Sequence, residues 1–427
     1  MKLVIEPSLQ KFLTHFSILL HAGSLSDPAG KSGLAHFATR ALLRGTKKKN
    51  FHRLSQEIEV LGGSLSLAID QSETLIRGSV LTQNLDAFLD LLREVIMEPG
   101  FEPVEMDLLR KILEGELEQS LQDPRTLVSR ALLQKTHFDS PVARAPEGTM
   151  EGLSNIKPED LRGWFNTFAV SENVVFGVTS AVDESDLRRR IESRFGSLRT
   201  GRSSVSKFPQ ASFPKHRQGI IVDRDEMSTV PLFFAVPGAG DGDPDSIALE
   251  VGNFIFGDDF TARLMQVLRA QNGWTYGAYS GYGQLLGPKR EAGLFSIYLF
   301  PSAEHIEKAA PKTLELFEEY VSRGLSEDEF RFAQEALSNR YPFRLDSAEK
   351  RLGLRIREIA TGRPFLTTEQ YRARLSSLDR KQVNDRIAER TSTESVIVAA
   401  AGEQQTLEAV FSKLPKMKEV ETVEVIP

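Results

Sequence analysis

Four positions in the first part of the chain carry residue types that could do chemistry, namely an imidazole, a hydroxyl, a guanidinium and a carboxylate. His36, Thr39 and Arg40 lie in an apolar segment that predicts a helix over Ser32–Leu43. Glu116 follows 76 positions after Arg40. His36 and Arg40 should share one helix face, because side chains four positions apart are neighbours. An imidazole can bind a metal ion, whereas a guanidinium is cationic at any ordinary pH and offers no lone pair.

The simplest interpretation of His36 is structural. A single histidine on a helix is more often a core or capping residue than a metal ligand. Thr39 cannot serve as a carboxylate base. Taken without their surroundings, these residues therefore leave the question of a metal site open.

A second pair of residues, Arg269 and Tyr276, stands seven positions apart near the junction of a predicted helix and a predicted strand. A guanidinium and a phenol are both strong hydrogen-bond donors, and such donors can stabilise an oxyanion that develops on a carbonyl. The alternative is that Arg269 is a solvated helix-end residue and Tyr276 packs in a strand. Spacing alone does not distinguish the two interpretations.

The elements that must position these residues form one module that occurs twice. Three blocks recur in the same order: a strand leading into a helix, two strands followed by two helices, and a strand between two helices. The first copy comprises Phe16–Gly23, Ser32–Leu43, Leu65–Ile69, Thr74–Leu81, Leu85–Leu92, Pro103–Leu121, Pro158–Phe168, Asn173–Val178 and Glu184–Phe195. The second copy comprises Val230–Val236, Ser246–Ile255, Trp274–Gly283, Ala292–Leu299, Ala303–Arg323, Ser326–Ser338, Arg380–Arg390, Ser395–Ala400 and Gln404–Leu414. Chance similarity of generic units is the alternative, and three blocks in one order argue against it.

The repeat predicts an α+β fold with two similar halves, each a mainly antiparallel sheet with helices packed on one face. The segment 200–216 is rich in Ser, Arg, Pro and Lys, a composition typical of a linker. We therefore expect an N-terminal domain over residues 1–199 and a C-terminal domain over residues 217–427. The two domains should superpose on each other.

Composition argues against several classes of protein. The net charge of −6 disfavours a nucleic-acid-binding protein, and the short Lys47–Lys49 run is typical of a solvated loop. The chain has no cysteine, so disulfide bonds and thiolate metal sites are impossible. Phe16–Leu20 is far shorter than a membrane span of about 20 residues. No signal peptide is visible, so we expect a cytoplasmic or periplasmic protein, with the cytoplasm favoured.

The segment around His36 resembles the active-site helix of the pitrilysin/insulinase-type zinc metallopeptidases, which carry the inverted motif His-x-x-Glu-His. In that family the two histidines bind zinc and the intervening glutamate acts as general base. A second glutamate, about 75 residues further on, completes the ligand set. His36 matches the first ligand and Glu116 the last. Thr39 stands in place of the base, and Arg40 stands in place of the second histidine.

The resemblance implies a degenerate metal site formed by His36, Thr39, Arg40 and Glu116. We expect the guanidinium of Arg40 to pair with Glu116 and to take the place of a metal contact. Losing one partner would leave a partly buried charge, and we expect this to cost about 3–5 kcal/mol. We expect no cofactor in this chain, and zinc only in a partner.

The second half retains positions that the family uses. Active members supply an arginine and a tyrosine, seven apart, to the substrate backbone and the oxyanion, which implies a substrate-binding role for Arg269 and Tyr276. In two-subunit relatives such as the mitochondrial processing peptidase, one subunit carries the zinc motif and its partner lacks it. The resemblance therefore implies a non-catalytic subunit that completes the peptide-binding chamber of a zinc-bearing partner and accepts unfolded peptides.

Two alternatives to this function stay open. One is a structural core subunit, as in the peptidase-related proteins of respiratory complexes, and the other is a peptide-binding protein without a proteolytic role. The Arg269/Tyr276 pair favours the subunit of a peptidase. In every case we expect the chain to lack zinc-dependent hydrolysis of its own.

Overall fold

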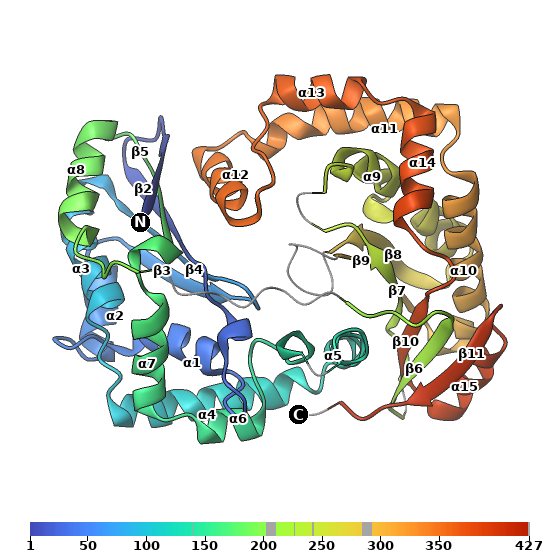
Figure 1. The fold of residues 1–427 in the computed structure, drawn as a ribbon, viewed down its shortest axis with the longest axis horizontal. Helices are drawn as coiled ribbons and strands as arrows, with labels where there is room; N and C mark the ends of the chain where they lie inside the picture. Colours follow the sequence, from blue (N-terminus) through green and yellow to red (C-terminus); the bar gives the residue numbers. More distant parts are fainter. Residues whose placement is uncertain (139, 202–210, 226, 241–242, 284–292, 426–427) are drawn as a thin grey trace.

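The chain folds around two β-sheets, one formed before residue 181 and the other after residue 216 (Figure 1). The computed structural model describes residues 1–138, 140–201, 211–225, 227–240, 243–283 and 293–425. Residues 202–210 of the predicted linker lie outside the described residues, and so does Ala292 at the start of one predicted strand.

The first sheet has five strands in the order β1-β5-β2-β4-β3, and the second has six in the order β11-β6-β10-β7-β9-β8. The strands of the first sheet are β1 Lys2–Pro7, β2 Leu13–Leu20, β3 Ser64–Ile69, β4 Thr74–Leu81 and β5 Val174–Ser180. The strands of the second are β6 Arg217–Asp223, β7 Leu232–Gly238, β8 Thr275–Tyr282, β9 Gly293–Pro301, β10 Ile397–Gly402 and β11 Met417–Thr422.

The strand order of the first sheet recurs in the second, where β6-β10-β7-β9-β8 takes the place of β1-β5-β2-β4-β3 and β11 is added outside β6. The outer pairs β1–β5 and β6–β10 are both parallel, and the next three pairs in each sheet are antiparallel. The predicted fold class, two related halves with mainly antiparallel sheets, is confirmed.

Helices surround the two sheets (Figure 1), and the residues that the structure describes form eight α-helices in the first half and seven in the second. The first half contains α1 Leu34–Ala41, α2 Phe51–Val60, α3 Leu85–Met97, α4 Pro103–Ser120, α5 Pro124–Thr136, α6 Met150–Asn155, α7 Pro158–Phe168 and α8 Glu184–Phe195. The second contains α9 Ser246–Asn253, α10 Ile306–Arg323, α11 Glu327–Arg340, α12 Ala348–Thr361, α13 Thr368–Ser376, α14 Arg380–Arg390 and α15 Gln404–Ser412. Within the described residues, no helix combines the length and the apolar character that crossing a membrane would need.

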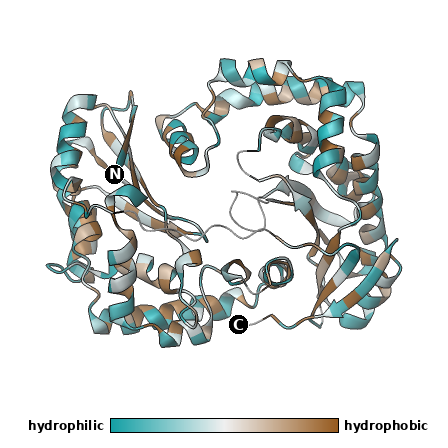
Figure 2. Cartoon of the chain, in the orientation of Figure 1, coloured by the Kyte–Doolittle hydropathy of each residue, from teal (hydrophilic) through white to brown (hydrophobic). Residues whose placement is uncertain are grey.

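Each sheet buries one face against helices of its own half. In the first half, Phe16, Ile18 and Phe176 from the strands join a core with Phe37 of α1 and Phe88 of α3. The second half builds a larger core of the same kind around β7, β9 and α10. In Figure 2 the hydrophobic colouring runs along the strands and along the helix sides that face them. Burial of these apolar faces is the main source of stability for both halves.

The second face of each sheet is covered by a helix that comes from the other half. Leu352, Ile356 and Ala360 of α12 pack on Leu19 and Val175 of the first sheet. In return, five buried residues of α5 pack on β6, β7, β9 and β10 of the second sheet; they are Leu127, Val128, Ala131, Leu132 and Leu133. Figure 1 shows α12 beside β5 and β2, and α5 close to the strands of the second half. The predicted arrangement, with helices on one face of each sheet, therefore holds for the helices of the same half but does not include the helix that comes from the other half.

Charged side chains reinforce this exchange of helices. Glu6 of β1, nearly buried in the first sheet, accepts hydrogen bonds from Arg351 at 2.6 Å and Arg355 at 2.8 Å, both on α12. His15 of β2 lies 3.1 Å from Glu349, which precedes them on the same helix. These contacts fix how α12 lies on the sheet, whereas its apolar side supplies the burial.

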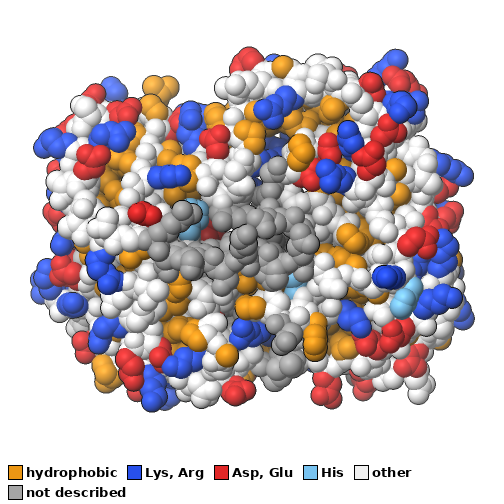
Figure 3. All heavy atoms as spheres, in the orientation of Figure 1, with side chains coloured by type: hydrophobic (Ala, Val, Ile, Leu, Met, Phe, Trp, Pro, Cys, Tyr) orange, Lys and Arg blue, Asp and Glu red, His pale blue; other side chains and the backbone are white. Residues whose placement is uncertain are grey.

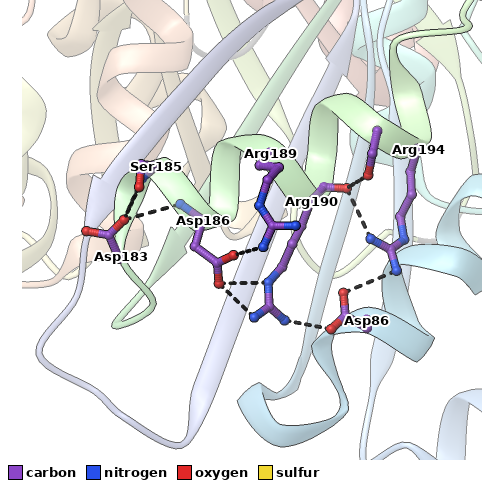
Figure 4. A network of polar contacts seen from close by, with 8 residues as sticks. Asp86, Asp183, Ser185, Asp186, Arg189, Arg190 and Arg194 are labelled. Carbon is purple, nitrogen blue, oxygen red and sulfur yellow. Dashed lines mark hydrogen bonds and ion pairs between the residues drawn. The ribbon is translucent and has the colours of Figure 1, made fainter.

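Within the first half, a network of carboxylates and arginines joins α8 to α3 on the outer surface (Figure 4). Arg190 donates to Asp186 of its own helix at 2.9 Å and to Asp86 of α3 at 2.6 Å. Arg194 lies 3.1 Å from the same Asp86. Asp86 is exposed and the two arginines are only partly shielded, so solvent weakens these pairs. The network orients α8 without carrying much of the stability.

Gly177 of β5 lies directly against α12. A Cβ atom added there would lie 2.5 Å from Cδ1 of Ile356 and 2.8 Å from the carbonyl oxygen of Ser17. We predict that Gly177→Ala lowers the free energy of unfolding by about 1–3 kcal/mol, because the extra methyl overpacks the contact. Urea denaturation measures the change.

Gly163 of α7 provides the control, because nothing lies within 4 Å of a Cβ atom added there. Gly163→Ala should leave stability unchanged or raise it by up to about 1 kcal/mol, since alanine favours a helix. Equal changes in the free energy of unfolding for the two substitutions would contradict close packing of α12 against Gly177.

Candidate functional site

The helix that carries the candidate site, α1, is fixed at its N-terminus by a buried carboxylate. Asp27 accepts hydrogen bonds from the amides of Gly33 at 2.7 Å and Ala35 at 2.8 Å. Gly33 has φ +96°, a left-handed conformation that glycine adopts without strain. Burial raises the pKa of Asp27 to about 7, and the two amide hydrogen bonds oppose the rise. Asp27 thereby sets the direction in which α1 leaves the preceding loop.

His36 and Thr39 both lie on the side of α1 that turns toward the protein. Nδ1 of His36 is buried and has no hydrogen-bond partner among the described residues. Burial lowers the pKa of His36, the nearby carboxylate of Glu147 opposes the shift, and the charge of Arg40 adds to it. Thr39 is 1% exposed, with its hydroxyl oxygen 3.4 Å from that of Thr74 on β4. Thr39 therefore fills a closed space between helix and sheet.

The predicted contact between Arg40 and Glu116 is present. The guanidinium donates two hydrogen bonds to the two carboxylate oxygens, at 2.8 and 3.0 Å, and so joins α1 to α4. These hydrogen bonds hold the pKa of Glu116 below its usual range. The expected energy was wrong, because the two side chains are 34% and 48% exposed. At that exposure the pair contributes about 1 kcal/mol or less.

A second pair of the same kind was missed in the sequence. Arg44, four positions after Arg40, donates to Glu105 of α4 at 2.7 Å. Glu105 and Glu116 are eleven positions apart, which places them on one side of α4. The sequence could have indicated this second pair, because the two arginines and the two glutamates each have a spacing that places them on one side of a helix. Arg44 lies in the short 3-10 turn Leu42–Arg44 that follows α1, so the two pairs join the C-terminal end of α1 and this turn to the two ends of α4.

The residues present do not fit a zinc ion. His36 and Glu116 remain as donors, but both oxygens of Glu116 are engaged by the cation at position 40. Among the residues that the structure describes, no group of three or more His, Cys, Asp or Glu side chains could hold a metal ion. A structural or catalytic zinc site needs at least three protein ligands. The site is instead closed by an ion pair.

Arg269 and Tyr276 are placed at one helix-to-strand junction of the second half. Arg269 lies on a π-helix over Met265–Gln271, and its carbonyl accepts from the amide of Gly273 at 2.9 Å. The exposed Arg269 guanidinium lies 5.8 Å from the ring centre of Phe260. Tyr276 is 80% exposed on β8, the edge strand of the second sheet. The interpretation of Tyr276 as a packing residue is therefore not supported.

Replacing the cation at position 40 should restore metal binding. We predict that Arg40→His takes up about one zinc ion per chain, because two imidazoles four positions apart would join a released Glu116 carboxylate. Elemental analysis after dialysis measures the uptake, and circular dichroism verifies the fold. The wild-type chain should retain well below that amount.

Arg44→His is the matched control, since it also replaces an arginine that pairs with a glutamate of α4. It should take up no zinc, because position 44 does not face Glu116. Uptake by the wild-type chain that is lost in His36→Ala would contradict the interpretation of the site.

The cap at Asp27 generates a separate prediction about stability. Asp27→Ala should lower the free energy of unfolding by about 2–3 kcal/mol, because two amides would lose their acceptor in a buried place. Asp183→Ala removes an exposed N-cap that also accepts from two backbone amides, those of Ser185 and Asp186 at the start of α8, and should cost less. Chemical denaturation compares the two. Equal losses would show that burial of the Asp27 cap is unimportant.

Comparisons with known proteins agree with this geometry. The sequence model described as insulinase (peptidase family M16) matches residues 4–149, and the one described as peptidase M16 inactive domain matches residues 155–337. A probable mitochondrial-processing peptidase subunit beta of Arabidopsis thaliana is 24% identical over 261 residues, 60% of this chain and 49% of that protein. The chain thus spans about half the length of that relative. The non-peptidase homolog YmxG of Helicobacter pylori is 24% identical over 382 residues, 88% of this chain and 86% of that protein.

A solved structure supports the fold over almost the whole chain. The crystal structure of a peptidase M16 inactive domain from Pseudomonas fluorescens matches with a TM-score of 0.86 and 23% identity, covering 94% of this chain and 95% of that one. Since the two family models together span most of the sequence, the chain belongs to the insulinase family of peptidases, family M16.

Proposed function

We propose that this chain is a catalytically inactive M16 protein that completes the peptide-binding chamber of a zinc-bearing partner from the same family. The observation that carries the proposal is the bidentate contact of Arg40 with Glu116, at 2.8 and 3.0 Å, in the place of a metal site. With Thr39 in the position of the base, the chain has neither a metal ligand set nor a general base there.

The second half supplies what such a partner could use. Arg269 and Tyr276 are exposed hydrogen-bond donors at the same helix-to-strand junction, and neither side chain is buried in the core. Their exposure leaves the guanidinium and the phenol able to donate to backbone carbonyls of an extended peptide. Removing them should therefore affect a shared chamber rather than the stability of this chain.

The names of the relatives support both parts of the proposal. One relative is a non-peptidase homolog, and others are beta subunits of mitochondrial-processing peptidases from a plant and from Caenorhabditis elegans. The family therefore includes both subunits of peptidases and proteins named as non-peptidases. Both kinds of relative are consistent with a subunit whose own metal site is degenerate. Unfolded peptides are the substrate class that we propose for the complex.

The test is reconstitution with a zinc-bearing M16 subunit, followed by peptide cleavage assays. We predict that Arg269→Ala and Tyr276→Phe each lower turnover by about 10²–10³-fold, because each removes one donor to the developing oxyanion. Assembly and zinc content must be unchanged. A rise in KM with constant kcat would assign the pair to ground-state peptide binding instead.

Two exposed residues serve as matched controls. Tyr279→Phe changes a second tyrosine of β8, and Arg331→Ala removes an exposed arginine of α11. Both should cleave at the wild-type rate. Wild-type rates in the Arg269 and Tyr276 variants would favour a structural scaffold, and full activity of the partner alone would refute the proposal.

A further inference from the structure

Helix α4 carries apolar side chains on two opposite sides. The residues of its inner side are buried in the core of the first half; they are Met106, Leu109, Leu113 and Leu117. On its outer side, Val104, Leu108 and Ile112 are 81%, 49% and 37% exposed. Because these three residues are four positions apart, they form one stripe along the helix, which we call the outer stripe. A surface helix normally presents polar residues to the solvent, so the outer stripe indicates a face that another element covers.

Single exposed apolar residues are common on soluble proteins and need no explanation. Leu9, in the loop between β1 and β2, is such a residue, with its side chain fully exposed. The outer stripe differs from Leu9, because its three members are neighbours on one helix whose inner side is fixed in the core. In Figure 3, hydrophobic, acidic and basic side chains lie next to one another along the lower left edge of the molecule, where Figure 1 draws α4.

One flank of the outer stripe is electrically neutral. Glu105 accepts a hydrogen bond from Arg44 at 2.7 Å, and Glu116 accepts one from Arg40 at 2.8 Å. The guanidinium of Arg44 also lies 4.1 Å from the ring centre of Phe51 on α2. This flank therefore presents paired charges and an aromatic ring, and it attracts neither sign of charge strongly.

The other flank of the outer stripe is acidic. Asp107, Glu114 and Glu118 share this side of α4, since they are spaced by whole helical turns. Within the part of the chain that the structure describes, their side chains form no hydrogen bond or ion pair. Lys111 lies on the same flank and offsets one of the three charges. Three carboxylates and one ammonium group leave a net negative charge along this flank.

The length and shape of the outer stripe suit a second helix. From Val104 to Gly115 the helix rises about 16 Å, or three turns. Nothing lies within 4 Å of a Cβ atom added at Gly115, so the backbone of a partner can approach closely at this end. Side chains four positions apart form the ridges between which the side chains of another helix pack.

Charge selects among the elements that could cover the outer stripe. A second copy of this chain would present the same stripe, whose flanks are neutral or acidic and do not complement an acidic flank. A membrane surface with anionic lipids would repel the carboxylates. We propose that the outer stripe of α4 docks an amphipathic helix of a partner protein, whose apolar side covers the stripe and whose lysine or arginine residues face the acidic flank.

The test uses the purified single chain without a zinc-bearing subunit, so its outcome is independent of the proposed function. The probe is a fluorescent, alanine-based helical peptide of about 18 residues, long enough to span the stripe, with leucines along one side and lysines along one flank. Fluorescence anisotropy should show saturable binding that weakens as ionic strength rises. The same peptide with glutamates in place of the lysines should bind at least about tenfold more weakly.

The apolar contact is tested by Leu108→Ser, which should weaken binding of the lysine peptide about tenfold or more, because it removes the central side chain of the stripe. Leu9→Ser is the matched control, since it removes an exposed leucine outside α4. It should bind the peptide like the wild type. Circular dichroism verifies that both variants are folded. Equal weakening in the two variants would overturn the proposal.

The acidic flank is tested by combining Asp107→Asn with Glu118→Gln, which should weaken binding of the lysine peptide about threefold to tenfold and reduce its salt dependence. Asp328→Asn combined with Glu335→Gln changes two exposed acids of α11 and the net charge equally, and it should bind like the wild type. Absence of binding, or equal binding of the lysine and glutamate peptides, would overturn the proposal. A dimer in sedimentation that Leu108→Ser dissociates, or binding to anionic lipid vesicles that Leu108→Ser abolishes, would assign the stripe to another occupant and overturn it as well.

Discussion

The exchange of α5 and α12 between the halves is the contact on which the rest of the structure depends. A sheet with two apolar faces must cover both, and each half has enough helices of its own for only one of them. Because α12 covers the first sheet and α5 the second, each half depends on the other to bury the second face of its sheet. The same exchange fixes the two sheets relative to each other. It therefore also sets where α1, with the altered metal site, lies relative to the exposed residues of β8.

The contact between Arg40 and Glu116 keeps α1 packed against α4 without a metal ion. A zinc ion bound between α1 and α4 would tie the two helices together, and the pair of Arg40 with Glu116 makes the same connection without a metal. Arg44 and Glu105 repeat the connection near the other end of α4. Thr39 fits the closed space against β4, where a carboxylate would have to be desolvated. The chain therefore has the family fold around Arg40 and Glu116, where an ion pair joins α1 to α4.

Much of the fold could be predicted because the repeat fixes elements by local patterns. The strand Thr74–Leu81 and the helices Pro158–Phe168 and Arg380–Arg390 have the predicted bounds. Helices α5 and α12 were not predicted, because they lie outside the three repeated blocks. In addition, a periodic apolar face shows that a helix is buried but not which sheet it covers. For the site, residue types and spacing were enough to place Arg40 beside Glu116. They could not give the exposure of that pair, which depends on how α1 and α4 pack in the folded chain.

The position of α12 in the sequence has a consequence for synthesis on the ribosome. The last strand of the first sheet ends at Ser180, whereas the helix that covers its second face ends at Thr361. At translation rates of about 5–20 residues per second, the sheet waits roughly 10–40 seconds for its cover. During that interval the nascent chain exposes an apolar surface that includes Leu19 and Val175. A chaperone that binds extended apolar segments would find its longest-lived target there, and slower translation of the second half would lengthen the exposure.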